Sequence, residues 1–281
     1  MSKRKIGLIG LGNIGGFYAE KLIDAGYSLT VLDIDKTKTQ AAVDLGAIEA
    51  STPAELTKAS DTIILSLPNS EIVEDVMQSE NGVLSALCEG QLVIDTSTCR
   101  PGTAVKCHKL CAEKKAAFID SPLTRRPVGQ ILMVGGNEKD FAYAEEILAC
   151  ISYKYKYIGP SGSGQYIKLM NQAIQAGLLA VKAEVVELTK SCGMDPKLLG
   201  DYLEYDIPEF LYTEDYKGGG NLAIHYKDLG YLNEVAHDTG ANIPISALVH
   251  ELFKTTKLYG EPNWHQGGIQ TYYKRLNSVE A

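Results

Sequence analysis

A group of small and polar residues recurs at helical spacing in the middle of the chain, in the segment GQYIKLMNQAIQ. Its members are four, three and four positions apart and so share one helix face: Gly164, Lys168, Asn171 and Gln175. A lysine exchanges a proton with a substrate oxygen when burial or neighbouring cations bring its pKa near neutrality. We therefore predict that this helix face lines the substrate-binding site and that Lys168 exchanges the proton with the substrate. A solvated lysine on a helix surface is the alternative, and spacing alone favours it.

A glycine-rich turn near the start of the chain has the pattern G-x-G-x-x-G, formed by Gly10, Gly12 and Gly15 with Asn13 and Ile14 between them. It follows an apolar run and opens a helix-like segment, which is the context of a dinucleotide-binding turn. Its glycines allow a tight turn and close approach of a pyrophosphate to the start of the helix.

A carboxylate follows this turn at the distance expected for ribose recognition. Asp33 closes the next apolar run, 18 residues after Gly15, and Asp35 adds a second negative charge. A carboxylate at this place accepts hydrogen bonds from the ribose hydroxyls and repels a 2′-phosphate. The sequence predicts NAD as the cofactor, with NADP less favoured.

The stretch SPLTRRPVGQ, residues 121–130, places two adjacent arginines in a connection between two apolar runs. A guanidinium group offers a planar fork of donors that suits a carboxylate, sulfonate or phosphate. Arg125 is predicted to read such an anion, whereas Arg126 has no assigned role because adjacent side chains of an extended chain point apart. The alternative is a solvated pair of arginines on a loop, or an ion pair with a neighbouring acid.

The first part of the chain alternates apolar runs with helix-like segments. Six runs are predicted to be strands: residues 5–10, 28–33, 62–68, 91–97, 116–122 and 131–136. Strands that alternate with helices predict an α/β fold, with a Rossmann-type, doubly wound and mostly parallel sheet. We expect an NAD-binding domain over residues 1–162.

The second part, residues 163–281, is predicted to be an all-α C-terminal domain for substrate binding and dimerisation, built on a long interdomain helix that ends at Cys192–Gly193. Helices are also expected at about residues 195–205, 221–239 and 244–259. The segment GPSGSG, residues 159–164, has the composition of a flexible linker. An apolar stripe on the long helix is interpreted as core: Ile167, Met170, Ile174, Leu178 and Val181.

Several motifs occur in an order that resembles the β-hydroxyacid dehydrogenase family over about residues 5–260. They are GLGNIGG, LPN at 67–69, DTSTCRPGT at 95–103, MVGG at 133–136, GQYIKLMNQ at 164–172 and KDL at 227–229. The resemblance implies hydride transfer between NAD(H) and a carbinol or aldehyde carbon, with Lys168 as general acid and base. It further implies a 3-hydroxyisobutyrate-, sulfolactaldehyde- or 4-hydroxybutyrate-type substrate, a short anionic semialdehyde or hydroxyacid.

The resemblance also implies roles for individual positions. Asn171 and Ser97 match residues that hold or back the substrate. Positions that match dinucleotide contacts are Asn13, Ile14, Asp33, Leu67, Pro68, Thr98 and, from the C-terminal domain, Lys227.

The chain departs from the family pattern after its fifth predicted strand. Most members have a serine and two glycines there, whose amides hold a carboxylate, whereas this chain has SPLTRRP. Members similar to sulfolactaldehyde reductase and 4-hydroxybutyrate dehydrogenase carry an arginine at this place, and counting from Asp120 puts Arg125 on it. Gln175 replaces a serine of sulfonate-binding relatives. The family often has an acid just before its last helix, where this chain reads NWHQGG at 263–268. His265 of this segment is a candidate for contact with the site, and a surface histidine is the favoured alternative.

Two other classes of function remain open from the sequence. An imine reductase shares the two-domain plan, but that family usually has aspartate or tyrosine in place of Lys168. A non-catalytic dinucleotide-binding scaffold would be expected to lose the lysine or the glycines, and both are present.

Composition limits the partners of the chain. A formal net charge of −8 over 281 residues argues against general binding to nucleic acid or an anionic membrane surface. The cysteines form no C-x-x-C pair, and CHKLC at 107–111 is interpreted as helical-surface thiols rather than a metal site. We expect a cytoplasmic homodimer or homotetramer without a metal.

Overall fold

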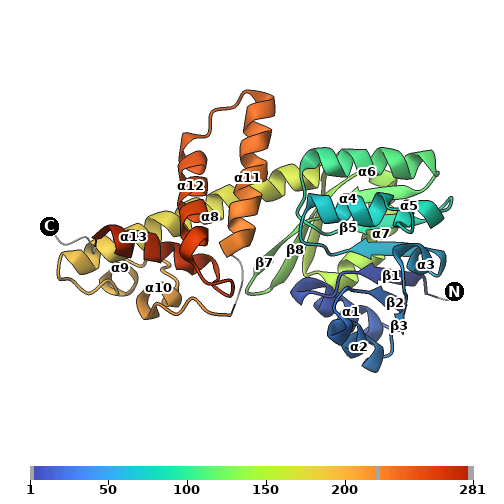
Figure 1. The fold of residues 1–281 in the computed structure, drawn as a ribbon, viewed down its shortest axis with the longest axis horizontal. Coiled ribbons are helices and arrows are strands. Elements are labelled where there is room, and N and C mark those ends of the chain that lie inside the picture. Colours follow the sequence, from blue (N-terminus) through green and yellow to red (C-terminus); the bar gives the residue numbers. More distant parts are fainter. Residues whose placement is uncertain (1–2, 219–221, 278–281) are drawn as a thin grey trace. The chain divides into compact units, whose positions relative to one another are not determined.

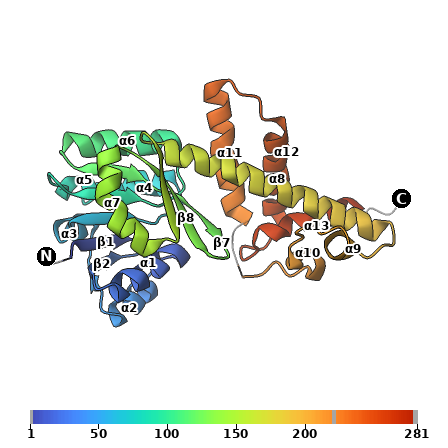
Figure 2. The ribbon, with the colours of Figure 1, turned by 180° about the vertical axis from the view of Figure 1, so that it is seen from behind.

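The computed structural model describes residues 3–218 and 222–277. By its internal contacts the chain separates into two compact units, Met1–Lys168 and Leu169–Ala281. Figures 1 and 2 show a sheet flanked by helices in the first unit and helices in the second. This division falls six residues later than the domain boundary predicted at residues 162/163.

The sheet of the first unit is built on a parallel core. Its strand order is β3-β2-β1-β4-β5-β6-β8-β7, with β9 paired to β8. Neighbouring strands from β3 to β6 are parallel, β8 is antiparallel to both β6 and β7, and β9 is parallel to β8. The strands are β1 (Lys5–Ile9), β2 (Ser28–Leu32), β3 (Ile48–Glu49), β4 (Thr62–Leu65), β5 (Leu92–Asp95), β6 (Ala117–Asp120), β7 (Leu123–Arg126), β8 (Gly129–Gly135) and β9 (Lys154–Gly159).

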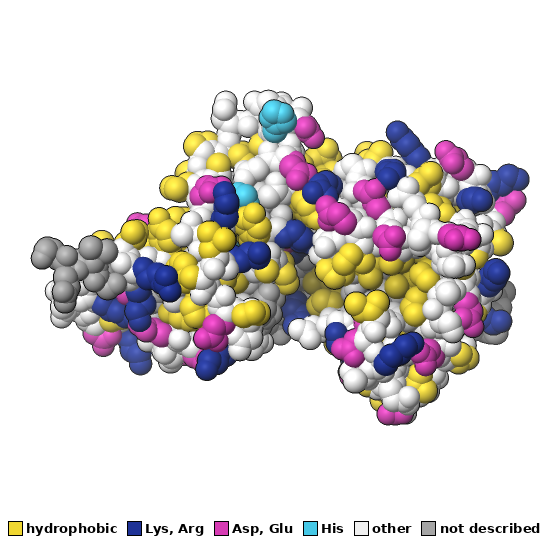
Figure 3. Space-filling model, viewed as in Figure 1, with side chains coloured by type: hydrophobic (Ala, Val, Ile, Leu, Met, Phe, Trp, Pro, Cys, Tyr) yellow, Lys and Arg dark blue, Asp and Glu magenta, His cyan; other side chains and the backbone are white. Residues whose placement is uncertain are grey.

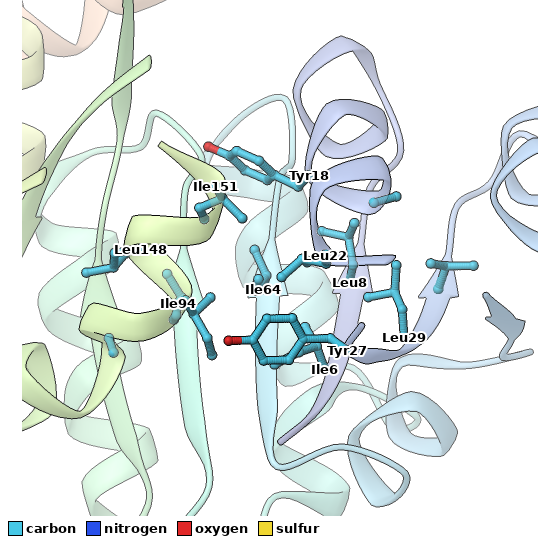
Figure 4. Close-up of a cluster of buried hydrophobic side chains, with 14 of the residues drawn as sticks. Ile6, Leu8, Tyr18, Leu22, Tyr27, Leu29, Ile64, Ile94, Leu148 and Ile151 are labelled. Carbon is cyan, nitrogen blue, oxygen red and sulfur yellow. The ribbon is translucent and has the colours of Figure 1, made fainter. Parts of the chain in front are cut away.

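Helices cover both faces of this sheet, which confirms the predicted doubly wound Rossmann fold. They are α1 (Asn13–Asp24), α2 (Lys36–Asp44), α3 (Pro53–Lys58), α4 (Ser70–Gln78), α5 (Val83–Ala86), α6 (Pro101–Glu113) and α7 (Glu138–Ile151). Helices α1, α2 and α7 pack on one face, where Figure 4 shows Leu22 of α1 and Leu148 of α7 meeting strand residues such as Leu8 and Ile94. Helices α3 to α6 pack on the other face.

The two cysteines of CHKLC belong to this second core, so their prediction as surface thiols is wrong. Cys107 and Cys111 lie on the buried side of α6, because positions four apart share one helix face. Burial raises the pKa of the Cys111 thiol to about 12. Both side chains therefore act as small apolar core residues.

The arginine-containing stretch is a strand rather than an irregular connection. Arg125 pairs with Gln130 and Arg126 with Gly129, so β7 and β8 form a hairpin closed by Pro127 and Val128. The proline suits this turn because it has no amide proton to offer to a strand neighbour. The hairpin extends the sheet beyond β6 (Figure 1).

The segment predicted to be a flexible linker is tied to the first unit. Asp120, at the end of β6, accepts hydrogen bonds from Gly162 N at 2.7 Å and Gln165 N at 3.1 Å. Gly164 lies against the same carboxylate, where a β-carbon would collide with the Met133 carbonyl oxygen. Gly164 is thus required for close packing and does not belong to an open substrate face.

Helix α8 (Ser163–Ser191) is the long helix predicted from the sequence, and Gly193, with φ +71°, follows its end. The second unit is helical in its described residues, as predicted. Its other elements are α9 (Leu198–Asp201), α10 (Glu209–Thr213), α11 (Leu222–Thr239), α12 (Pro244–Tyr259), the 3₁₀ helix η1 (Gln266–Ile269) and α13 (Gln270–Asn277). No helix within residues 3–218 and 222–277 has the length and hydropathy to cross a bilayer.

The side of α8 that packs in the core of the second unit is not the side that was predicted to be core. Buried residues such as Leu169, Ala176 and Val186 pack against α11 and α12. The apolar stripe from Ile167 to Val181 is 40–64% exposed, so its prediction as core is wrong. Periodicity locates an apolar helix face, but it does not determine which of two apolar faces is covered within the chain.

Candidate active site

The glycine-rich turn joins β1 to α1, and each of its glycines meets a different requirement. Gly10 has φ +93° and no space for a β-carbon beside Ser66 O, and a β-carbon on Gly15 would collide with Gly10 O. At Gly12, nothing lies within 4 Å of a β-carbon position. Gly12 precedes α1 without a side-chain cap, so the first helical amides remain available to an anion.

Asp33 ties this turn to the end of β2. Its Oδ2 accepts from Leu11 N at 2.5 Å and its Oδ1 accepts from Asp35 N at 2.8 Å. Each carboxylate oxygen retains a second lone pair for a ribose hydroxyl. Asp35 caps α2 by accepting from Thr37 N at 3.0 Å, so its place is explained without a ligand.

Two further loops leave the same edge of the sheet. Leu67, after β4, donates its amide to Ser97 Oγ at 2.9 Å, and Ser97 follows β5. Ser97 is buried, and Thr98 follows it in the same loop. Because the carboxyl ends of parallel strands share one edge of a sheet, the predicted cofactor-binding positions of the first unit come together there. Figure 3 shows hydrophobic side chains gathered on this unit between α4 and the pair α1 and α2.

These features fit a dinucleotide. The open space beside Gly12 and the uncapped amides at the start of α1 suit the pyrophosphate. The carboxylate at the end of β2 suits the ribose, which is the next part of the dinucleotide. Among the described residues, no group of three or more histidine, cysteine or acidic side chains is arranged to hold a metal ion.

Two buried carboxylates stand side by side at this edge, and sequence reasoning gave neither a role. Asp95 and Asp120 end the neighbouring strands β5 and β6 and pair in register. Burial raises the pKa of Asp95 to about 6, against hydrogen bonds from Ser97 and with a further rise from the Asp120 charge. Burial also raises the pKa of Asp120, opposed by its hydrogen bonds from Gly162 and Gln165. The sequence feature that could have indicated them is an aspartate at the end of two successive apolar runs, in Asp-Thr-Ser and in Asp-Ser-Pro.

Lys168 lies in the second turn of α8 and is the last residue of the first unit. Its side chain is 8% exposed, so it is not the solvated lysine that spacing alone favours. Farther along α8, Asn171 and Gln175 are half-buried, and Gln175 Nε2 lies 3.4 Å from Asn171 Oδ1. Helical spacing places these two amides on the same helix side as Lys168.

Arg125 and Arg126 are both exposed on β7. Burial raises the pKa of the Tyr18 hydroxyl, in α1, well above its usual value, and Thr96 and the charge of Arg125 partly offset that rise. Arg126 Nη1 donates to the carbonyl of Arg125 at 3.3 Å.

Two candidates of the second unit have partners within that unit. Lys227 Nζ lies 3.3 Å from the buried Asp228 Oδ1, and Asp228 Oδ2 accepts from Gln172 Nε2 of α8 at 2.7 Å. His265 caps η1 by accepting from Gly267 N at 3.0 Å, and its Nε2 lies 3.0 Å from Asp215 O. His265 therefore has a structural role, and the predicted reach of Lys227 towards the cofactor stays a prediction.

The fold and the glycine-rich turn define a Rossmann-type dinucleotide-binding protein with an appended helical unit. A family model described as the NAD binding domain of 6-phosphogluconate dehydrogenase matches residues 5–159. A second, described as NAD-binding of NADP-dependent 3-hydroxyisobutyrate dehydrogenase, matches residues 162–271. The chain belongs to the β-hydroxyacid dehydrogenase family, whose members are NAD(P)-dependent oxidoreductases acting on CH–OH groups.

Curated relatives agree with this assignment, and a solved structure shares the fold. The chain is 31% identical over 274 residues to the mitochondrial 3-hydroxyisobutyrate dehydrogenase of Mus musculus, covering 90% of this chain and 82% of that protein. It is 29% identical over 292 residues to the 2-(hydroxymethyl)glutarate dehydrogenase of Eubacterium barkeri, covering 99% and 97%. A structure of Mycobacterium tuberculosis 3-hydroxyisobutyrate dehydrogenase with L-serine superposes with a TM-score of 0.86 at 23% identity, over 96% and 99% of the two chains. The last likeness concerns the fold.

Proposed function

We propose that the protein transfers a hydride between NAD(H) and a short aldehyde or alcohol that carries an anionic group, as in 3-hydroxyisobutyrate-, sulfolactaldehyde- or 4-hydroxybutyrate-type substrates. The observation that carries the proposal is the near-complete burial of Lys168, in a chain of this family, at the start of a helix tied to the carboxyl edge of the sheet. Curated relatives are named for hydroxyacids of this kind, including L-threonate in Cupriavidus necator.

The cofactor proposed is NAD rather than NADP. NAD(H), when bound, supplies or accepts the hydride at C4 of its nicotinamide. Gly10, Gly12 and Gly15 form the turn for the pyrophosphate, with the amides of Asn13 and Ile14 at the helix start. Asp33 accepts from the ribose hydroxyls and disfavours a 2′-phosphate. Leu67, Pro68 and Thr98 are assigned to the rest of the dinucleotide, and Lys227 to a contact from the helical unit.

Lys168 is proposed as the general acid and base. In the reductive direction its ammonium group gives a proton to the carbonyl oxygen as the carbon receives the hydride, and in the oxidative direction the neutral amine takes the proton from the hydroxyl. Asn171 and Gln175 are assigned to hydrogen bonds with substrate oxygens, and Ser97 to the loop that backs the substrate.

Arg125 is proposed to hold the anionic group of the substrate. Its exposed guanidinium is available as a fork of donors. Both a carboxylate and a sulfonate can accept two hydrogen bonds from a guanidinium group. Activity on the carboxylate semialdehydes and on sulfolactaldehyde distinguishes the two.

We also propose a homo-oligomer assembled through α8. The side chains of Met170, Ile174, Leu178 and Val181 form an uncharged stripe, each about half exposed or more. A monomer rarely leaves such a surface uncovered, and a second copy of the chain brings the same stripe to a two-fold interface.

The predicted cytoplasmic location fits six cysteines that are all free, as expected in a reducing compartment.

The test is NADH oxidation with a panel of succinate, methylmalonate and tartronate semialdehydes and sulfolactaldehyde, in the native protein and in Lys168→Ala. Turnover on at least one is expected, with kcat reduced by at least about 10²-fold in Lys168→Ala and NADH affinity retained. Lys182→Ala, on the same helix and bound to Asp206, is the control and should keep kcat. Folded protein that binds NADH and turns over none of these aldehydes would instead be a scaffold, and turnover retained in Lys168→Ala would refute the mechanism.

A further inference from the structure

A buried glutamine in the first turn of α8 bridges to the loop that follows β5. Gln165 Nε2 donates to Ser97 O at 2.9 Å, and its Oε1 accepts from Cys99 N at 2.9 Å. The residue has no exposed surface. One side chain therefore forms hydrogen bonds with both a carbonyl and an amide of the same loop. Only a group that donates and accepts at the same time can do this, as a primary amide does.

The same glutamine is also fixed through its backbone. Gln165 N donates to Asp120 Oδ2 at 3.1 Å. In the loop that the Gln165 side chain holds, Ser97 Oγ accepts from Leu67 N at 2.9 Å. These contacts link the carboxyl ends of β4, β5 and β6 to the start of α8. All of them lie within the first unit.

Lys168 follows Gln165 by three residues, almost one helical turn, which corresponds to about 4.5 Å along the axis. Helix α8 continues through both residues, so whatever fixes Gln165 also fixes the backbone of Lys168. The loop on the other side of the bridge contains Ser97 and Thr98, which are assigned to substrate and cofactor. The bridge therefore connects the part of α8 that carries the proposed proton carrier to the loop that is assigned to substrate and cofactor.

We propose that Gln165 is a positioning residue, which sets the Lys168 amine against the 97–99 loop through its two-sided amide bridge. The proposal rests on the proposed function of Lys168. If Gln165 served only to fill space, an apolar side chain of the same length would do so without the cost of burying an amide. An error of about 1 Å in the placement of a catalytic group costs about 10²-fold in rate, so such a bridge matters for turnover.

The chain contains a matched control at the opposite edge of the sheet. Gln91, before β5, donates from Nε2 to Thr57 O at 2.8 Å and to Ser60 O at 2.6 Å, and it accepts from Cys88 N at 2.6 Å. It makes the same kind of bridge in the same unit, but at the amino ends of the strands. Changing it tests the loss of a loop bridge without moving Lys168.

The first experiment replaces Gln165 with glutamate, which keeps the shape. A protonated glutamate still donates to Ser97 O and accepts from Cys99 N, whereas an ionised one can only accept. Burial, together with the charges of Asp95 and Asp120, raises the pKa of the introduced carboxyl. We expect kcat of Gln165→Glu, relative to the native protein, to fall by about 10²-fold at pH 8 and to recover as the pH is lowered. NADH affinity and the kcat of Gln91→Glu should stay within about threefold of the native values throughout.

The second experiment does not depend on turnover. Gln165→Met removes both hydrogen bonds, so the amides of residues 97–99 should exchange with deuterium faster than in the native protein, while Gln91→Met leaves their exchange unchanged. Native kcat in Gln165→Met, or unchanged exchange at residues 97–99, would overturn the proposal. So would unfolding of both Gln165 variants while the Gln91 variants fold, because the role would then be in folding. If the native protein reduces none of the aldehydes, the proposed function fails, and the exchange result still decides whether the bridge holds the loop.

Discussion

Asp33 and Leu11 are joined by a hydrogen bond of 2.5 Å from the Leu11 amide to the Asp33 carboxylate. The bond ties the end of β2 to the turn that follows β1, although 22 residues separate them in sequence. One side chain thus holds the turn proposed for the pyrophosphate and is the side chain proposed to accept from the ribose hydroxyls. The proposed choice of NAD and the shape of the turn therefore depend on the same side chain.

Removing the charge of Asp33 should change the cofactor preference. In Asp33→Asn, the repulsion of a 2′-phosphate is lost and the ribose hydroxyls lose a charged acceptor, so the ratio of kcat/KM for NADH to that for NADPH should fall by at least about tenfold. Steady-state kinetics with both cofactors measure it. The control is Asp61→Asn, whose carboxylate accepts from Lys5 N at 2.8 Å at the other edge of the sheet. An unchanged ratio in Asp33→Asn would exclude Asp33 as the selecting residue.

The two arginines of β7 should differ in their effect on the substrate. Loss of a charged hydrogen bond costs about 1.5–3 kcal/mol, so Arg125→Ala should lower kcat/KM for the best anionic aldehyde by about 10- to 100-fold. Activity on a neutral aldehyde of similar length should hardly change. Arg126→Ala is the control, because its guanidinium is directed to the neighbouring carbonyl. Equal losses in the two variants, or equal losses on charged and neutral aldehydes, would remove Arg125 from the anion site.

The Asp95 carboxyl should make the protein less stable as the pH rises. Its pKa is raised from 3.8 to about 6 by burial, so the folded state binds more protons than the unfolded state between these values. The stabilisation is complete below about pH 3.8 and is lost as the pH rises through about 6. Other carboxyls, such as Glu74, have lowered pKa values and act in the opposite sense, so the effect must be read from a variant.

Asp95→Asn removes this titration and keeps an acceptor for Ser97 N. Above pH 7 the variant should be more stable than the native protein by on the order of 3 kcal/mol, the value of a shift of about two pKa units, and the advantage should disappear by pH 4. Denaturant unfolding at several pH values measures it, with the exposed Asp44→Asn as the control. A stability difference that does not change with pH would show that Asp95 is ionised or protonated alike in both states.

The parts of the fold that follow from local rules could be predicted from the sequence. The glycine-rich turn, the strand that ends at Asp33 and the long helix that ends before Gly193 each depend on a few neighbouring residues. The parallel sheet then follows because strands and helices alternate. The hairpin that carries Arg125 was missed because its strand is short and contains two charges, and its stability comes from pairing with β8.

Contacts between distant segments could not be predicted in the same way. Gln165 meets Ser97 and Cys99 across more than 60 residues of sequence, and no local pattern distinguishes it from an exposed glutamine on a helix. The exposed stripe of α8 was misplaced for a related reason: the helix has apolar residues on two sides, and only packing decides which side is covered. The proposed function thus rests on residues that the sequence marks, Lys168 and Asp33, and on distant contacts that it does not mark.

A charge in the stripe of α8 should separate the proposed oligomer. Leu178 and Ile174 are 57% and 64% exposed in the single chain, so a lysine at either place is solvated in a monomer but buried without a partner in a two-fold interface. Leu178→Lys should therefore shift the mass in sedimentation velocity from a dimer or tetramer to a monomer, with the melting temperature of the monomeric unit little changed. Leu258→Lys, at an exposed leucine of α12, is the control and should keep the native mass. A native protein that sediments as a monomer, or a Leu178→Lys variant of unchanged mass, would show that the stripe does not join two copies.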